Sequence, residues 1–146
     1  MVHVSDQAFG SSIDKGKIYY FKSNKLVSTT QPHYFIVIAN PTDNLILFVC
    51  CTSQFDKRAR FIELNDIPLS TLVWLKPNGE NGLKKDIYVD CNSYFKYSKA
   101  ELIQMYDQNQ IEFIGYIPDS KLEEIKQGVI DSPLIVNEIK EFLKVD

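Results

Sequence analysis

Two dense apolar segments joined by a turn constrain the fold of this chain more than any other feature. Residues 35–38 and 45–51 are almost entirely apolar, and residues 40–44 (Asn-Pro-Thr-Asp-Asn) are typical of a turn. Segments this apolar are typical of strands that are buried on both faces or that line a small barrel. The sequence therefore predicts a buried hairpin. Polar residues at its two open ends, 31–33 and 52–53, are then expected at one rim of the sheet.

The remaining sequence predicts short strands first and helices afterwards. Residues 1–14 are expected to form a flexible leader, and residues 15–146 a single domain. Further strands are predicted at 17–22, 60–64, 72–75, 86–91 and 111–117, with a charged connection at 54–59. Helices are predicted after two capping-box sequences, 98–101 and 120–123, and after Ser132-Pro133. This order predicts an α+β fold, an SH3-like small β-barrel with C-terminal helices.

Composition indicates a globular protein and excludes several other classes. Apolar residues make up 45% of the 146 residues, which is enough for a hydrophobic core. No segment approaches 18 consecutive apolar residues, and the first residues lack a secretory signal pattern, so we expect a cytoplasmic protein with no membrane partner. The three cysteines form no Cys-x-x-Cys motif and there are only two histidines. Reduced thiols and no metal site are therefore expected.

Charge is distributed unevenly along the chain. The net charge is -3, but residues 1–100 carry 12 Lys and Arg against 9 Asp and Glu, whereas residues 101–146 carry 4 against 10. This asymmetry is compatible with a local phosphate-binding face on an acidic protein. An ordinary mixed surface would give the same distribution, so both interpretations stay open at this point.

Three polar residues at the ends of the predicted hairpin are the candidate catalytic residues. His33 stands at the start of the first strand, and Thr52 and Ser53 follow the second. An imidazole can hold or release a proton near neutral pH, and hydroxyls can donate hydrogen bonds to a phosphate. The alternatives are a histidine with a structural hydrogen bond and hydroxyls that satisfy backbone donors at a strand end.

Four basic residues are candidates for binding a nucleic-acid backbone. Lys57, Arg58 and Arg60 form the densest basic cluster of the chain, and Lys96 lies between two aromatic residues. Cations steer phosphates and aromatic rings can stack bases. The alternatives are a solvated loop for the cluster and core packing for the aromatic residues beside Lys96.

Several sequence strings, in order and spacing, resemble the MazF/PemK/Kid family of toxin endoribonucleases. The resemblance covers roughly residues 15–146. The strings that carry it are Lys15–Tyr19, His33–Asn40, Phe48–Ser53, the segments Val89–Ser93 and Ser98–Leu102, and Ile114–Leu122. Where the family has Arg followed by Pro before its second strand, this chain has His33 followed by Tyr34.

The resemblance implies a metal-independent, cofactor-independent endoribonuclease that cleaves single-stranded RNA by attack of the 2′-hydroxyl on the adjacent phosphate. It also implies a growth inhibitor of a toxin–antitoxin system that forms a homodimer and is silenced by a cognate antitoxin. In such an enzyme His33 would act as acid or base, and Thr52 and Ser53 would hold the phosphate. Lys57, Arg58 and Arg60 would steer the RNA backbone.

Two alternatives remain. Because an imidazole cannot reproduce the bidentate, permanent charge of arginine, the chain is also compatible with a catalytically inactive module that binds RNA or a protein partner. The sequence pI of about 5.4 is compatible with an interaction protein that has no nucleic-acid role.

Overall fold

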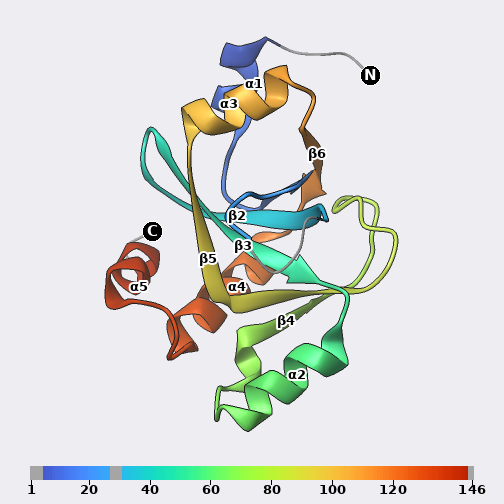
Figure 1. Cartoon of the computed structure of the whole chain (residues 1–146), viewed down its shortest axis with the longest axis vertical. Coiled ribbons are helices and arrows are strands. Elements are labelled where there is room, and N and C mark those ends of the chain that lie inside the picture. Colours follow the sequence, from blue (N-terminus) through green and yellow to red (C-terminus); the bar gives the residue numbers. More distant parts are fainter. Residues whose placement is uncertain (1–4, 27–30, 145–146) are drawn as a thin grey trace.

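The computed structural model describes residues 5–26 and 31–144, which form an α+β fold (Figure 1). The elements in chain order are α1 (Asp6–Ser12), β1 (Lys17–Phe21), β2 (His33–Thr42), β3 (Leu45–Thr52), α2 (Phe55–Leu64), the 3-10 turn η1 (Leu69–Thr71), β4 (Leu72–Leu75), β5 (Ile87–Ser98), α3 (Lys99–Asp107), β6 (Ile111–Tyr116), α4 (Asp119–Asp131) and α5 (Asn137–Lys144). The strands form one sheet in the order β4-β5-β3-β2-β1-β6, and each pair of neighbours is antiparallel. The predicted α+β class with C-terminal helices is confirmed, and the strands expected to form an SH3-like small β-barrel make one six-stranded antiparallel sheet.

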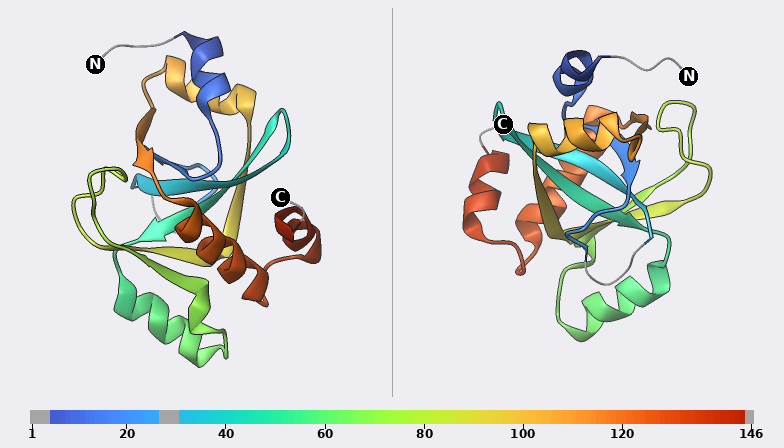
Figure 2. Two further views of the ribbon diagram at one scale, coloured as in Figure 1. Left: turned by 180° about the vertical axis from the view of Figure 1, so that it is seen from behind. Right: turned by 45° about the horizontal axis from the view of Figure 1, so that its top comes forward.

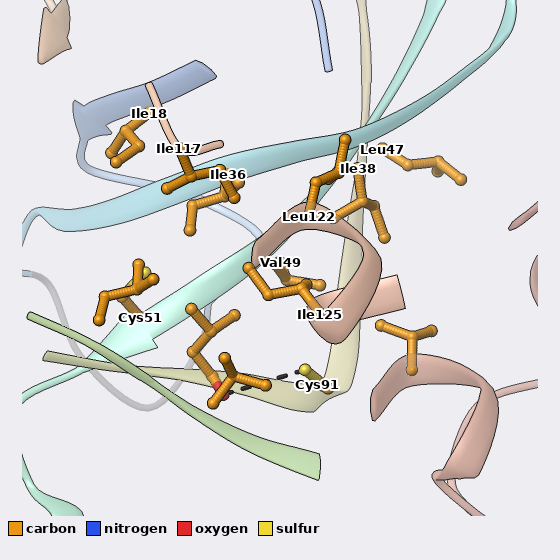
Figure 3. Packing of buried hydrophobic residues seen from close by; sticks show 14 of the residues in the cluster. Ile18, Ile36, Ile38, Leu47, Val49, Cys51, Cys91, Ile117, Leu122 and Ile125 are labelled. Carbon is orange, nitrogen blue, oxygen red and sulfur yellow. Dashed lines mark hydrogen bonds between the residues drawn. The ribbon is translucent and has the colours of Figure 1, made fainter. Parts of the chain in front are cut away.

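The central hairpin is the most deeply buried part of the sheet, as the sequence predicts. All four residues of 35–38 are fully buried. Alternate side chains of a strand point to opposite faces, so Ile36 and Ile38 enter a core beneath α4 and α5, which Figure 3 shows from close by. Phe35 and Val37 enter an aromatic-rich core on the other face, which α1 and α3 cover. Burial on both faces explains why these strands are apolar without alternation.

Strand β5 is twice as long as the sequence predicts, because it serves two parts of the sheet. Its C-terminal half pairs with the start of β3 (Phe48 opposite Phe95), and its N-terminal half pairs with the end of β3 (Cys50 opposite Asp90). The register shifts between these two pairs, and β5 changes direction there (Figure 1). The N-terminal half also pairs with the edge strand β4.

The N-terminal segment differs from its sequence-based prediction. Residues 6–12, assigned to the leader, form α1, which packs beside α3 at one end of the molecule (Figure 2). Phe9 is only 5% exposed because its ring stacks on Tyr106, so the folded part begins before residue 15. Residues 1–4 lie outside the described part of the chain.

The predicted connection at 54–59 and strand at 60–64 are wrong, because this segment is helix α2 at the opposite end of the molecule (Figure 2). Ala59 and Ile62 share the buried side of that helix and contact one small core cluster. Phe61 and Leu64, two apolar residues of the predicted strand, are exposed.

Of the three predicted helix starts, one is confirmed. Ser98 forms a complete capping box with Glu101 at the start of α3. Pro118, rather than Ser120, is the N-cap residue of α4, and no side chain caps that helix. Ser132 follows the end of α4 instead of starting a helix, and α5 begins at Asn137. Within residues 5–26 and 31–144, no helix has the length and apolar character needed to cross a bilayer.

Candidate functional site

A surface pocket of about 980 Å³ lies where the first residues of β2, the last residues of β3 and the first turn of α2 come together. The structure brings five of the seven predicted site residues to this pocket: His33, Thr52, Ser53, Lys57 and Arg58. The remaining lining residues include aromatic, thiol, charged and hydroxyl side chains, namely Tyr20, Tyr34, Phe95, Cys50, Cys51, Lys85, Asp90 and Ser93.

The register of the central hairpin explains how His33 and Thr52 reach one pocket. Phe35 lies opposite Cys50. If that register continues for two residues toward the open end, His33 lies opposite Thr52, with both side chains on the same face of the sheet. This is the rim that the sequence predicts.

The hydrogen bonds of these residues leave groups available for a ligand. The Nδ1 atom of His33 lies 2.9 Å from the carbonyl oxygen of Gln31. When Nδ1 carries the proton, it donates to that carbonyl and Nε2 is left as an acceptor. The Thr52 Oγ1 atom accepts a hydrogen bond from the backbone N–H of Gln54 at 3.1 Å, so its hydroxyl hydrogen remains for another acceptor. Ser53 is exposed in the connection to α2.

Arg58 is tied to the pocket wall by a charged partner. Its Nη2 atom lies 2.7 Å from the Oδ2 atom of Asp90 in β5, and its guanidinium carbon lies 4.6 Å from the centre of the Phe61 ring. The Nε atom of Arg58 is buried without a hydrogen-bond acceptor among the described residues. Asp90 therefore compensates much of the arginine charge. Within the described chain, the neighbouring Lys57 has no such ion pair.

A buried hydrogen-bond network fixes the position of the Asp90 carboxylate. Its Oδ1 atom accepts hydrogen bonds from the backbone N–H and the side-chain Nδ2 of Asn92, both at 3.1 Å. The same Nδ2 also donates to Thr71 Oγ1 at 3.0 Å, and Asn92 Oδ1 accepts from Ser132 Oγ at 2.7 Å. The network thus joins β5 to η1 and to the end of α4, and it fixes the carboxylate that Arg58 binds.

The environment of the two thiols that line the pocket, Cys50 and Cys51, does not favour the thiolate. Burial, with the nearby charge of Asp90 as a smaller contribution, raises the pKa of Cys50 to about 12. Burial likewise raises the pKa of Cys51 and of Cys91 above the ordinary value. All three thiols are free, as predicted. Among the described residues, no group of three or more His, Cys, Asp or Glu side chains is arranged to hold a metal ion.

Arg60 and Lys96 do not reach this pocket. Arg60 is an exposed residue of α2 and is absent from the pocket lining. Lys96 is exposed on β5, with its Nζ atom 6.0 Å from the centre of the Tyr94 ring. The aromatic residues on either side of it, Phe95 and Tyr97, are buried in the core that α1 and α3 cover.

Sequence analysis missed three lining residues that the geometry makes prominent. Asp90 could have been identified from the sequence, because it is a charged residue inside an apolar strand. Tyr20 and Tyr34 face each other as cross-strand partners, with ring centres 4.8 Å apart. No local signal identifies this pair, because only the pairing of β1 with β2 brings the two rings together.

The chain has structural likenesses among solved proteins but no match in sequence. No family model and no curated protein matches the chain. Among solved structures, the chain is similar to the Mycobacterium tuberculosis toxin MazF-mt6, with a TM-score of 0.49 and 13% sequence identity over 77% of this chain and 91% of that one. A likeness of this degree transfers no residue role or activity to the present chain.

Proposed function

We propose that this protein is a metal-independent endoribonuclease that cleaves single-stranded RNA. The observation that carries the proposal is that one pocket gathers an imidazole, two hydroxyls and a cation: His33, Thr52, Ser53 and Lys57. These are the groups that transesterification of RNA requires, namely a proton carrier, hydrogen-bond donors to the phosphate and positive charge.

In the proposed reaction the ribose 2′-oxygen attacks the adjacent phosphorus, and the bond from phosphorus to the 5′-oxygen breaks. His33 takes the proton of the 2′-hydroxyl or supplies the proton to the departing 5′-oxygen, with water completing the exchange at the other position. Thr52 and Ser53 donate hydrogen bonds to the phosphate oxygens, and Lys57 stabilises their growing negative charge. The products are a 2′,3′-cyclic phosphate and a 5′-hydroxyl.

The two basic residues outside the pocket have a secondary part in this proposal. Arg60 and Lys96 would interact only with phosphates outside the pocket, and they would attract the RNA backbone by long-range electrostatics. In the cell, the resemblance to the MazF/PemK/Kid family implies a cytoplasmic homodimer that arrests growth until a cognate antitoxin covers the site. Those properties belong to the proposal.

One observation favours a second candidate, a catalytically inactive module that binds RNA or a protein partner. Asp90 already engages Arg58 at 2.7 Å, so the pocket arginine is not fully available to stabilise a phosphate. Of the described cations of the pocket, Lys57 and Lys85 would then provide the charge. Such a site could bind an RNA backbone without accelerating its cleavage.

The deciding experiment incubates purified protein with a long unstructured RNA in EDTA and analyses fragment ends by gel mobility before and after phosphatase treatment. We expect wild-type protein to leave 2′,3′-cyclic phosphates. We expect His33→Ala to reduce the rate by at least about 100-fold, the lower range for loss of a general acid or base. Thr52→Ala should also reduce the cleavage rate, and its circular dichroism spectrum should match that of the wild-type protein.

A matched pair of cations on the same helix provides the control. Lys57→Ala should weaken RNA binding and reduce its salt dependence by about one charge, whereas Arg60→Ala, outside the pocket, should change both much less. If the RNA stays intact but its binding is weakened more by Lys57→Ala than by Arg60→Ala, the result would support the binding module. Absence of any salt-dependent RNA binding would reject the ribonuclease and the RNA-binding module, and would leave a module that binds a protein partner.

A further inference from the structure

The pocket passes over the ends of the strands from one face of the sheet to the other. Because side chains alternate along a strand, His33 and Tyr34 point to opposite faces of β2, and Cys50 and Cys51 point to opposite faces of β3. All four residues nevertheless line the same pocket. The pocket is therefore a path across the rim, with an imidazole side and a tyrosine side.

The tyrosine side presents two aromatic rings. Tyr20 and Tyr34 are both half-buried, their ring centres are 4.8 Å apart, and their planes are tilted by 47°. Tilted rings do not cover each other fully, so part of each ring surface is left for a third planar group. Burial, together with the nearby Tyr20 and Glu112, raises the pKa of Tyr34, so its hydroxyl stays protonated at neutral pH and can donate a hydrogen bond.

We propose that Tyr20 and Tyr34 form a nucleobase-binding subsite, on which one unpaired base of a single-stranded RNA stacks while its phosphate lies on the His33 side of the rim. This inference rests on the proposed function and specifies how that site holds its substrate. Stacking on an aromatic side chain accepts any base, so the subsite selects unpaired RNA more strongly than it selects a sequence.

The connectivity of the pocket is the reason to favour a nucleotide over another planar ligand. Adjacent residues of a strand have Cα atoms about 3.8 Å apart, so the imidazole and the tyrosine rings approach the rim from neighbouring positions on opposite faces. A nucleotide has the same layout, because its base and its phosphate extend from different sides of one sugar. Lys85 also lines the pocket and adds positive charge for the sugar–phosphate backbone of the bound nucleotide.

The test measures binding without cleavage. The probe is a 12-nucleotide single-stranded RNA of mixed sequence with 2′-O-methyl groups, which removes the attacking hydroxyl, and variants of it carry one abasic site at each position in turn. We expect Tyr34→Ala to weaken binding of the intact probe roughly tenfold, whereas Tyr34→Phe keeps the ring and most of the affinity. Tyr116→Ala removes a tyrosine that is 49% exposed on β6 and outside the pocket, and it should leave the affinity unchanged.

The abasic probes make the inference independent of any loss of folding in Tyr34→Ala. With wild-type protein, an abasic site at one position should weaken binding by about the same factor as Tyr34→Ala does with the intact probe. The abasic probe and Tyr34→Ala together should lower the affinity little more than either change alone. Tyr20→Ala should couple to the same position. Additive losses at every position, or equal losses with Tyr116→Ala, would overturn the inference.

These outcomes separate the subsite from the cleavage reaction. Cleavage of ordinary RNA by a protein that shows no coupling at any abasic position would reject the subsite and retain the ribonuclease. Coupling without cleavage would retain the subsite and favour the binding module. No binding of the intact probe by wild-type protein would reject the subsite and the RNA-binding function together.

Discussion

Loss of the buried polar side chain of Asn92 is expected to destabilise the fold strongly. It is only 5% exposed, and its side chain makes three hydrogen bonds, to Thr71, Asp90 and Ser132, at 3.0, 3.1 and 2.7 Å respectively. These bonds join β5 to η1 and to the end of α4, three segments that are distant in sequence. Replacement by alanine removes all three bonds at once and leaves the buried Ser132 hydroxyl without its acceptor.

The magnitude follows from these contacts. Each of the three lost bonds contributes a net of about 1 kcal/mol. We therefore expect Asn92→Ala to lower the free energy of unfolding by about 3 kcal/mol. For a domain of this size, that corresponds to a melting temperature lower by about 6–12 °C.

The assay is urea and thermal denaturation followed by far-ultraviolet circular dichroism, with a two-state fit. Asn40→Ala, at an exposed position of β2, is the matched control and should change stability by less than about 0.5 kcal/mol. In a double-mutant cycle, Ser132→Ala should couple to Asn92→Ala by more than about 0.5 kcal/mol. A loss below about 1 kcal/mol for Asn92→Ala, or additivity with Ser132→Ala, would refute the assigned network.

A pocket thiol, a helix cap and a close backbone approach provide further tests. The pKa of Cys50 is about 12 in the folded protein and 9.0 is its ordinary value, so the contribution of its protonated thiol to stability should be fully present below pH 9 and be lost as pH rises from 9 toward 12. Cys50→Ala should therefore reduce the fall in unfolding free energy over this pH range in urea titrations, and an unchanged fall would contradict the assignment. Ser98→Ala should cost about 1 kcal/mol of unfolding free energy and Ser120→Ala less than about 0.5, whereas equal losses would argue against the assigned cap. Gly115→Ala should destabilise by about 1–3 kcal/mol, because its Cβ would lie 2.4 Å from a loop carbonyl oxygen; Gly79→Ala has nothing within 4 Å and should be tolerated, so similar melting temperatures for the two variants would refute the close approach.

Local patterns account for the parts of the fold that sequence analysis predicted correctly. The hairpin around residues 40–44 combines apolar strands with turn residues, and the cap at Ser98 depends on residues only three positions apart. Helix α2 was mistaken for a connection and a strand because Ile62 and Leu64 flank the polar Glu63, as in the alternation of a half-exposed strand. Its buried side consists of Ala59 and Ile62, and packing on β4 and β5 selects the helix.

The same distinction applies to the candidate site. The sequence by itself identified His33 and Thr52 as polar groups at the ends of buried strands, because strand ends can be read from the apolar pattern. Only the tertiary structure decided that Asp90 would hold Arg58 and that Tyr20 would face Tyr34. These contacts depend on strand register and on the bend of β5, which arise from pairing between distant segments. No local sequence pattern records that pairing, because its free energy comes from burying both partners together.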